Sequence, residues 1–155
     1  MVKEADDIKI IARNRKALKD YEIQETFEAG ISLLGTEVKS LRDGKINLAD
    51  AYAIIENGQV ILRNLHISPY QMASHDNHEP TRPRRLLLHR REIRKLKVQT
   101  EQKGMTLVPL VIYFKRHLVK VELALGMGRK KYDKREAIAK ADAERRMQKA
   151  IKRDY

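Results

Sequence analysis

The sequence predicts a mainly β protein, a small closed barrel of about six antiparallel strands with two or three helices inserted. Three observations support this fold class. Short segments alternate apolar and polar residues, an Asn-Gly turn signal separates two apolar runs, and 42% of the 155 residues are hydrophobic, enough for one modest core. An open sheet with a helix on one face is the alternative. Among barrels, the oligonucleotide-binding (OB) type suits a basic chain of this size.

The first elements are a short helix, a strand and a second short helix. Residues 14–21 (NRKALKDY) indicate a turn of helix that leads into the fold. Residues 21–33 (YEIQETFEAGISL) alternate like a strand until Gly30 interrupts them, which predicts a bulge or a sharp bend. The period then changes to a helical one, with Thr36 as the expected N-cap and Glu37 near the positive end of the helix dipole.

Two pairs of strands are predicted, one in each half of the chain. In residues 47–70, two apolar runs flank the letters ENGQ, and the Asn-Gly dipeptide supplies the positive φ angles that a type I′ turn requires. Residues 106–126 (TLVPLVIYFKRHLVKVELALG) form the second pair, with a turn near residues 116–117. Because Pro109 has no N–H to donate, we expect it at an edge or at the start of a strand.

A loop and a helix are expected between the two strand pairs. Residues 71–85 (QMASHDNHEPTRPRR) have no periodicity and contain two prolines, which indicates a long loop. Residues 86–104 (LLLHRREIRKLKVQTEQKG) are expected to form a helix with Leu88, Ile93 and Leu96 as its apolar stripe and the final glycine as its stop.

The charge balance points to a polyanionic partner. With 33 Lys and Arg against 21 Asp and Glu, the net charge is +12, which is typical of proteins that bind nucleic acid or an anionic membrane. The membrane interpretation is weak, because no apolar run approaches the roughly 18 residues needed to span a bilayer. The first ten residues do not resemble a signal peptide, and the absence of Cys excludes disulfides and thiolate zinc sites. A cytoplasmic location is therefore expected.

Two segments carry most of the excess charge. Residues 81–103 contain nine Lys or Arg and two Glu, and arginine dominates the first part, where its planar guanidinium suits bidentate contact with phosphate. Residues 129–155 contain 11 basic and five acidic residues and three large aliphatic side chains, so this tail is predicted to be disordered alone and helical on a partner. A single basic segment is usually a solvent-exposed face, but two such segments in one small chain favour an RNA-binding function. The predicted division is a barrel with an N-terminal extension, residues 1–128, and a basic tail, residues 129–155.

Few side chains indicate chemistry, and each has an ordinary alternative. Glu28 is either an exposed strand carboxylate, which the residues alone favour, or an acceptor for donors on a base edge. Tyr132 either caps the tail or stacks on an unpaired base, and its basic neighbours favour stacking. His75 and His78 are spaced like a metal pair but lie in a loop, so no metal is predicted. The motifs of phosphate-binding loops and catalytic nucleophiles are absent, so neither catalysis nor a cofactor is expected.

Four stretches of the sequence form a recognisable pattern: residues 14–21 (NRKALKDY), 27–52 (FEAGISLLGTEVKSLRDGKINLADAY), 80–93 (PTRPRRLLLHRREI) and 128–136 (GRKKYDKRE). They resemble small protein B (SmpB), the SsrA-binding protein family of bacterial trans-translation. The resemblance covers nearly the whole chain from about Asn14, and the second stretch is the most specific.

The resemblance implies an RNA-binding adaptor that is not an enzyme and has no cofactor or small-molecule substrate. Such proteins have an OB-like barrel, bind the tRNA-like domain of transfer-messenger RNA (ssrA RNA) and deliver it to stalled ribosomes. Their C-terminal tail enters the empty mRNA channel near the small-subunit decoding centre and folds there as a helix.

The resemblance also implies site residues, and it reverses the ordinary interpretation of Glu28. Ala143 stands where some members have an aromatic residue. Positions that match the family's RNA-binding residues are Asn14, Arg15, Lys16, Glu28, Leu87 and Lys120, and the cations Lys39, Arg42, Arg84 and Arg85 complete the expected RNA-binding set. The expected ribosome-binding tail residues are Arg129, Lys130, Lys131, Tyr132, Asp133, Lys134, Arg135, Ile151 and Lys152.

Two other functions fit parts of this pattern. A general RNA-binding or ribosomal protein fits the composition equally well, and it would show little preference among structured RNAs. A metal-dependent nuclease would need carboxylates such as Glu28, Asp50 and Glu122 to meet, and no spacing in the sequence argues for that.

Overall fold

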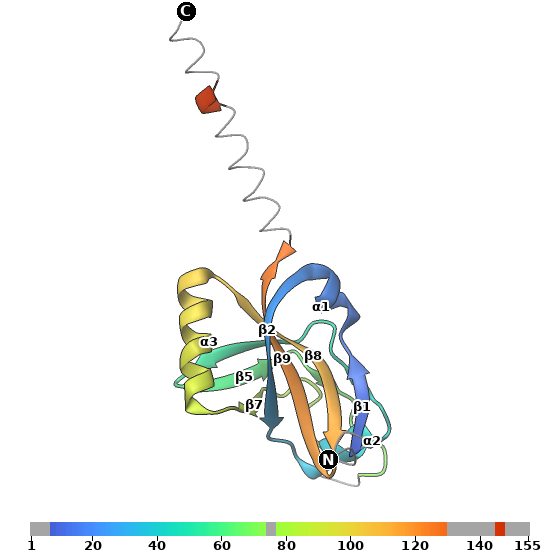
Figure 1. The fold of residues 1–155 in the computed structure, drawn as a ribbon. Coiled ribbons are helices and arrows are strands. Elements are labelled where there is room, and N and C mark those ends of the chain that lie inside the picture. Colours follow the sequence, from blue (N-terminus) through green and yellow to red (C-terminus); the bar gives the residue numbers. More distant parts are fainter. Residues whose placement is uncertain (1–6, 74–76, 130–144, 148–155) are drawn as a thin grey trace, which may run out of the picture.

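The structure of the chain, a computed structural model, describes residues 7–73, 77–129 and 145–147 (Figure 1). Within these ranges the chain forms nine strands and three helices, and residues 145–147 are also helical. In chain order the elements are β1 (Ile8–Arg13), α1 (Arg15–Asp20), β2 (Tyr21–Ile31), α2 (Gly35–Arg42), β3 (Ile46–Asn47), β4 (Tyr52–Glu56), β5 (Gln59–Arg63), β6 (His66–Ile67), β7 (Arg84–Leu87), α3 (Arg90–Lys103), β8 (Thr106–Lys115) and β9 (Leu118–Gly128).

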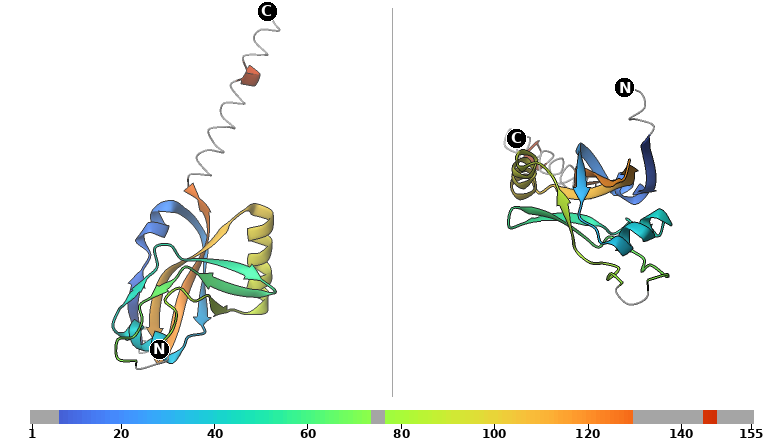
Figure 2. Two further views of the ribbon diagram at one scale, coloured as in Figure 1. Left: turned by 180° about the vertical axis from the view of Figure 1, so that it is seen from behind. Right: turned by 90° about the horizontal axis from the view of Figure 1, so that it is seen from below.

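Six of the strands form a closed ring. The order is β8-β4-β5-β7-β2-β9, every neighbouring pair is antiparallel, and β9 pairs again with β8. β1 extends the sheet on the other side of β8, and β3 pairs with β6 separately. Seen from below, the β4–β5 hairpin faces β8 and β9 across the interior (Figure 2). The ring confirms the predicted fold class over the open-sheet alternative.

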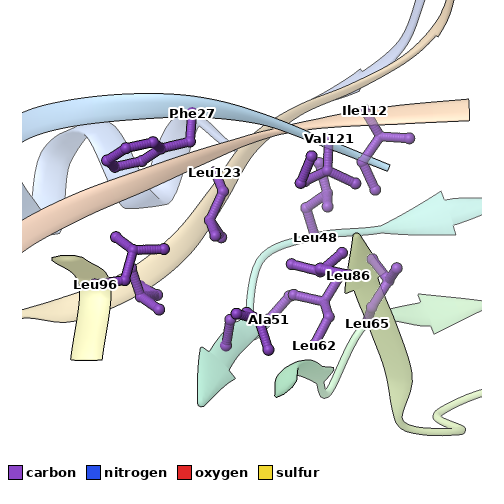
Figure 3. Packing of buried hydrophobic residues seen from close by; sticks show 14 of the residues in the cluster. Phe27, Leu48, Ala51, Leu62, Leu65, Leu86, Leu96, Ile112, Val121 and Leu123 are labelled. Atoms are coloured by element: carbon purple, nitrogen blue, oxygen red, sulfur yellow. The ribbon is translucent and has the colours of Figure 1, made fainter. Parts of the chain in front are cut away.

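The main core fills the interior of the ring. Leu62 of β5 and Leu86 of β7 point inward from one side, and Phe27 and Leu123 lie on the other side with Leu96 of α3 beside them (Figure 3). Burying an aliphatic side chain of this size contributes about 1.5–3 kcal/mol. The apolar side of α3 therefore fixes the helix against the ring, with its charged residues outward.

The turns that were predicted from Asn and Gly are confirmed. Asn57 and Gly58 have φ angles of 52° and 72°, as a type I′ turn between β4 and β5 requires. Gly104 ends α3 in the left-handed conformation, with a φ angle of 65°. The turn between β8 and β9 contains Arg116, whose φ angle is 59°.

The helix α3 begins later than predicted. Residues 84–87 form β7 instead of the end of a loop and the start of a helix, because Leu86 is buried in the core and pairs with Val60 of β5. α3 begins at Arg90, so Leu88 packs against the core from the connection between β7 and α3 and does not belong to a helical stripe.

Two backbone irregularities lie elsewhere than predicted. Pro109 lies inside β8, and not at an edge or a strand start, because the register against β9 shifts between Pro109 and Val111 and places the missing N–H at a bulge. The bulge in β2 lies between Ile23 and Glu25. Gly30, where the bend was expected, pairs with strands on both sides.

The cap of α2 also differs from the prediction. Leu34 occupies the N-cap position, and its backbone N–H donates to Oε1 of Glu37 at 2.8 Å. The hydroxyl of Thr36, the expected N-cap, instead bonds Nδ1 of His78 at 2.9 Å. Nε2 of the same imidazole bonds the carbonyl oxygen of Ile67 at 2.9 Å. The imidazole therefore ties the segment before β7 to α2 and β6.

The strand β9 ends at Gly128, where the predicted barrel domain ends. Most of the predicted tail, residues 130–144 and 148–155, lies outside the described residues, so its disorder when free and its helix when bound stay predictions. The same holds for its expected ribosome contacts beyond Arg129. No helix among the described residues is long and apolar enough to cross a membrane.

Candidate nucleic-acid interface

Two adjoining depressions mark the surface where β2, β7 and β9 meet the start of α3. Their volumes are about 350 Å³ and about 320 Å³. Glu28 and Lys120 line both, so the two hollows form one continuous surface. The first is completed by Gly30, Leu87, Leu88, His89 and Glu92, and the second by Lys115, Arg116 and Leu118.

The strand register brings three of the predicted RNA-binding residues together here. Gly30 of β2 pairs with Leu87 of β7 on one side and with Lys120 of β9 on the other. Because side chains alternate along a strand, Glu28 lies on the same face as Gly30. Gly30 keeps the middle of this face open, since a Cβ there would lie 3.2 Å from the Cβ of Leu87. A carboxylate, an ammonium and a half-exposed leucine thus surround a position without a side chain.

The carboxylate of Glu28 is held in place by β8. The hydroxyl of Tyr113 donates to Oε2 at 2.5 Å, and Nζ of Lys115 lies 3.3 Å and 3.4 Å from the two carboxylate oxygens. The Tyr113 hydrogen bond lowers the pKa of Glu28, partial burial opposes it, and Lys115 and Lys120 lower it further. At neutral pH Glu28 therefore presents an ionised, acceptor-only group.

The phenol of Tyr113 remains protonated in this arrangement. Burial raises the pKa of Tyr113 well above its ordinary value, and the neighbouring carboxylate of Glu28 raises it further. A protonated phenol can only satisfy Glu28 as a donor, so the direction of this hydrogen bond is fixed. Tyr113 and Lys115 were missed in the sequence analysis. The sequence feature that could have identified them is the predicted turn between β8 and β9, because strand pairing around this turn places Tyr113 opposite Lys120.

Replacing Tyr113 with phenylalanine is expected to raise the pKa of Glu28 toward its ordinary value. The ring still fills its buried place, but the largest interaction that favours the charged carboxylate is lost. A pH titration of the Glu28 side-chain carboxyl carbon by NMR measures the shift. Since the folded pKa of Glu28 is depressed, its stabilising contribution is present above the unfolded pKa and disappears as the pH falls through the folded pKa. In the variant the folded pKa lies closer to the unfolded one, so this loss is smaller and is complete at a higher pH.

The matched control is Tyr52→Phe, because Tyr52 lies on β4 and lines neither depression. Its titration curve for Glu28 should coincide with that of the unchanged protein. An unshifted Glu28 titration in Tyr113→Phe would show that the hydroxyl does not hold the carboxylate.

Comparison with known proteins identifies the family. Residues 11–153 match the family described as SmpB protein. This chain belongs to the SmpB family. It is 57% identical over 147 residues to the SsrA-binding protein of Halothermothrix orenii, covering 95% of each chain. It is 58% identical over 152 residues to the SsrA-binding protein of Caldanaerobacter subterraneus subsp. tengcongensis, covering 98% of this chain and 96% of the relative.

A solved structure supports the same family at the level of the fold. A chain in the structure described as "tmRNA-SmpB: a journey to the center of the bacterial ribosome" is 53% identical in sequence. The superposition has a TM-score of 0.64 and covers 76% of this chain and 82% of that chain. The closed ring of strands and its helices are thus the architecture of an SmpB protein.

Two residues of the expected RNA-binding set have structural roles. The side chain of Asn14 is buried: its Oδ1 accepts the backbone N–H of Ala17 at 3.0 Å and caps α1, while its Nδ2 donates to the carbonyl oxygens of Leu48 and Pro109. Arg84 is fully buried against Glu37. Both side chains are buried within the protein, and the expected contact of these two residues with RNA stays a prediction.

The remaining predicted cations are exposed but lie apart from the depressions. Lys16 of α1 lies 3.4 Å from Asp50, and Arg15 precedes it in the same helix. Lys39 of α2 stacks over the ring of Tyr70, and Arg42 closes that helix. Arg85 of β7 is exposed next to the buried Arg84. Their roles in SmpB function stay predictions.

The described residues offer no metal centre. No group of three or more His, Asp or Glu in the described ranges could hold a metal ion. His78 is 5% exposed, and both its ring nitrogens are occupied by Thr36 and Ile67. His75, the other half of the predicted pair, lies outside the described residues.

Proposed function

We propose that this chain is an RNA-binding adaptor that binds the tRNA-like domain of transfer-messenger RNA and delivers it to stalled ribosomes for trans-translation. The observation that carries the proposal is the meeting of Glu28, Leu87 and Lys120 at one open surface of a chain of the SmpB family with a net charge of +12. The protein acts by binding and positioning RNA, without a catalytic step or a cofactor.

The three side chains offer complementary contacts to folded RNA. The ammonium of Lys120 attracts a phosphate. The ionised carboxylate of Glu28 accepts hydrogen bonds, and RNA offers donors on base edges and on ribose 2′-hydroxyls. Leu87, 50% exposed, presents an apolar surface to a base or sugar. Because the carboxylate of Glu28 repels phosphate, this surface favours an RNA conformation in which a base or a sugar, and not a phosphate, faces Glu28.

The C-terminal tail provides the second half of the adaptor. It is proposed to enter the empty mRNA channel and reach the decoding centre of the small subunit, using Arg129–Arg135, Ile151 and Lys152. The tail carries 11 basic and five acidic residues, which suits a channel lined by RNA. Its root at Gly128 lies eight residues along β9 from Lys120, about 26 Å at the usual strand rise. Two RNA surfaces can therefore be engaged at once.

A competition experiment tests the RNA partner. The full chain should bind the tRNA-like domain in preference to elongator tRNA at physiological salt, and Glu28→Gln and Lys120→Ala should each weaken that binding about 10- to 100-fold, the usual cost of a charged hydrogen bond. Lys45→Ala, an exposed cation outside both depressions, is the control and should change binding little. Equal binding to both RNAs, falling together as salt rises, would support a general RNA-binding protein instead.

A further inference from the structure

The helix α3 begins at the rim of the RNA-binding depression. His89, at its N-cap, and Glu92, in its first turn, line the same hollow as Glu28 and Lys120. From there the helix runs along the outside of the strand ring (Figure 1). An RNA seated in the depression therefore has α3 as its immediate neighbour.

The outward side of this helix is basic over its first two turns. We call this surface the α3 basic face, and it is opposite to Leu96, which is fully buried in the core. At 100° per residue, its side chains project away from the ring, and Glu101 is the first acid beyond them on the same side. The two turns span about 11 Å at the helical rise of 1.5 Å per residue. The α3 basic face consists of Arg90, Arg91, Arg94 and Lys97, all exposed.

The charges of the α3 basic face are not neutralised within the described part of the protein. No described carboxylate forms an ion pair with any of the four, whereas Lys95, on the side toward β2, lies 2.8 Å from Glu25. A helix that only had to cover the core could place the same cations against acids, as Lys95 does. The four free cations are therefore available to an external anion.

The arrangement is also unfavourable for the isolated helix. Arg90 and Arg94 are four residues apart and repel each other, as do Arg91 and Lys95. Arg90 and Arg91 stand in the first turn, where the helix dipole favours negative charge. Local stability would favour acids at these positions, so the cations indicate a partner with dense negative charge.

We propose that the α3 basic face extends the RNA-binding depression and holds the phosphate backbone of the RNA that is bound there. The inference rests on the proposed function, because it takes the RNA at Glu28 and Lys120 as its starting point. Three of the four cations are arginines, whose planar guanidinium can contact two phosphate oxygens at once. The face begins next to His89 and Glu92, which line the depression together with Lys120, so an RNA strand bound in the depression reaches it more readily than a separate acidic protein would.

The contact is to the backbone and carries no sequence information. Glu28 and Leu87 recognise a base or sugar turned toward the ring, and the α3 basic face fixes the path of the strand beyond it. Substitutions in the depression and in the α3 basic face should therefore have different effects on binding. Loss of Glu28 reduces the preference for the tRNA-like domain, whereas loss of α3 cations reduces the number of phosphates neutralised.

The test is the salt dependence of binding to the tRNA-like domain by the full chain. The double variant Arg94→Gln with Lys97→Gln removes two cations and keeps helix-forming residues. The slope of log K against log salt should become shallower by about 1.4–1.8, and affinity should fall roughly tenfold at physiological salt. The matched control, Lys9→Gln with Lys45→Gln, removes two exposed cations from β1 and from the turn after α2, and should keep the original slope. The thermal midpoint of the α3 variant should stay equal or rise, because a like-charge pair is removed.

The outcomes separate this inference from the proposed function. An α3 variant with the slope and affinity of the control would overturn the inference, while a defective Lys120→Ala measured in the same series would leave the proposed function standing. A variant that binds the tRNA-like domain normally but loses ribosome association would also overturn it, because the α3 basic face would then serve another partner. If the unchanged protein showed no preference for the tRNA-like domain, the proposed function itself would fail.

Discussion

Replacing Glu37 with alanine is expected to lower the free energy of unfolding by about 3–5 kcal/mol, the usual cost of breaking a buried ion pair. Glu37 and Arg84 are both fully buried, and Arg84 donates to Glu37 as well as to the carbonyl oxygens of Leu65, at 2.6 Å, and Pro80, at 3.1 Å. Without the carboxylate, the buried guanidinium loses its counter-charge. Arg82 loses its 2.6 Å contact to the same group.

The cluster is also expected to affect RNA binding, because of the elements it joins. Glu37 belongs to α2 and Arg84 to β7, three residues before Leu87 at the RNA-binding depression. A loosened β7 moves Leu87 away from Gly30, where the register now holds it. The Glu37→Ala variant should therefore lose both stability and affinity for the tRNA-like domain.

Urea unfolding with a matched control measures the stability effect. Glu56 pairs with Arg63 at 3.2 Å, but the two side chains are 52% and 41% exposed, so Glu56→Ala should cost less than about 1 kcal/mol. The double change Glu37→Leu with Arg84→Met should recover most of the loss, because it leaves no buried charge. If Glu37→Ala cost no more than Glu56→Ala, the buried pair would not hold β7 in place.

The same cluster makes stability depend on acid pH. Burial alone would raise the pKa of Glu37, but hydrogen bonds from Arg82, the Leu34 backbone and Arg84 outweigh it and lower the pKa below its ordinary value. The folded pKa is thus below the unfolded one. The stabilising contribution is present above the unfolded pKa and is lost as the pH falls through the folded pKa. Glu37→Ala should flatten this part of the stability profile.

Removing residues 130–155 is expected to reduce peptide tagging on stalled ribosomes to background and to change affinity for the tRNA-like domain only a few-fold. The truncated chain keeps β9 complete, including the pairing of Gly128 with Tyr21. The root of the tail lies about 26 Å from Lys120. This exceeds the screening length of about 8 Å at physiological salt, so the net charge of +5 that is removed acts weakly on the binding site.

A shuffled tail is the matched control for this truncation. A chain with residues 130–155 in scrambled order keeps the composition and the charge, so it separates recognition by the tail from simple electrostatic attraction. Tagging in a reconstituted translation system and binding to the tRNA-like domain are measured side by side. Tagging restored by the scrambled tail would mean that charge alone suffices. Loss of RNA binding on truncation would refute the division between ring and tail.

Features that depend on a few neighbouring residues were predicted correctly. The Asn57-Gly58 turn and the Gly104 helix end follow from φ angles that these residues adopt at little cost, so no distant contact is needed to specify them. The strand pair β8 and β9 was likewise predicted from its run of β-forming residues. The family and its RNA partner were recognised from motifs. Motifs also pointed to Glu28, whose own chemistry in isolation indicated an ordinary surface carboxylate.

Features that depend on residues far apart in the sequence were not predicted correctly. The strand β7 exists because Leu86 finds the core and a partner strand, although its sequence continues into a helical pattern. Tyr113 acts on Glu28 from 85 residues away along the chain. Pro109 is tolerated inside a strand because a bulge falls at that position. Each outcome requires the register between strands, which no local window contains.

Arg84 and Arg85 show most clearly the difference between what the local sequence predicts and what the tertiary structure decides. Their composition and charge are identical, and both were expected to bind RNA. In β7, successive side chains point to opposite faces of the sheet. One face turns Arg84 inward to Glu37, where a guanidinium is stable only because a buried carboxylate and two carbonyl groups receive it. Arg85 points to solvent. The sequence shows that both residues are positively charged. Only the tertiary structure shows that Arg84 is buried in an ion pair while Arg85 is exposed to solvent, because the closed ring of strands has an inside and an outside.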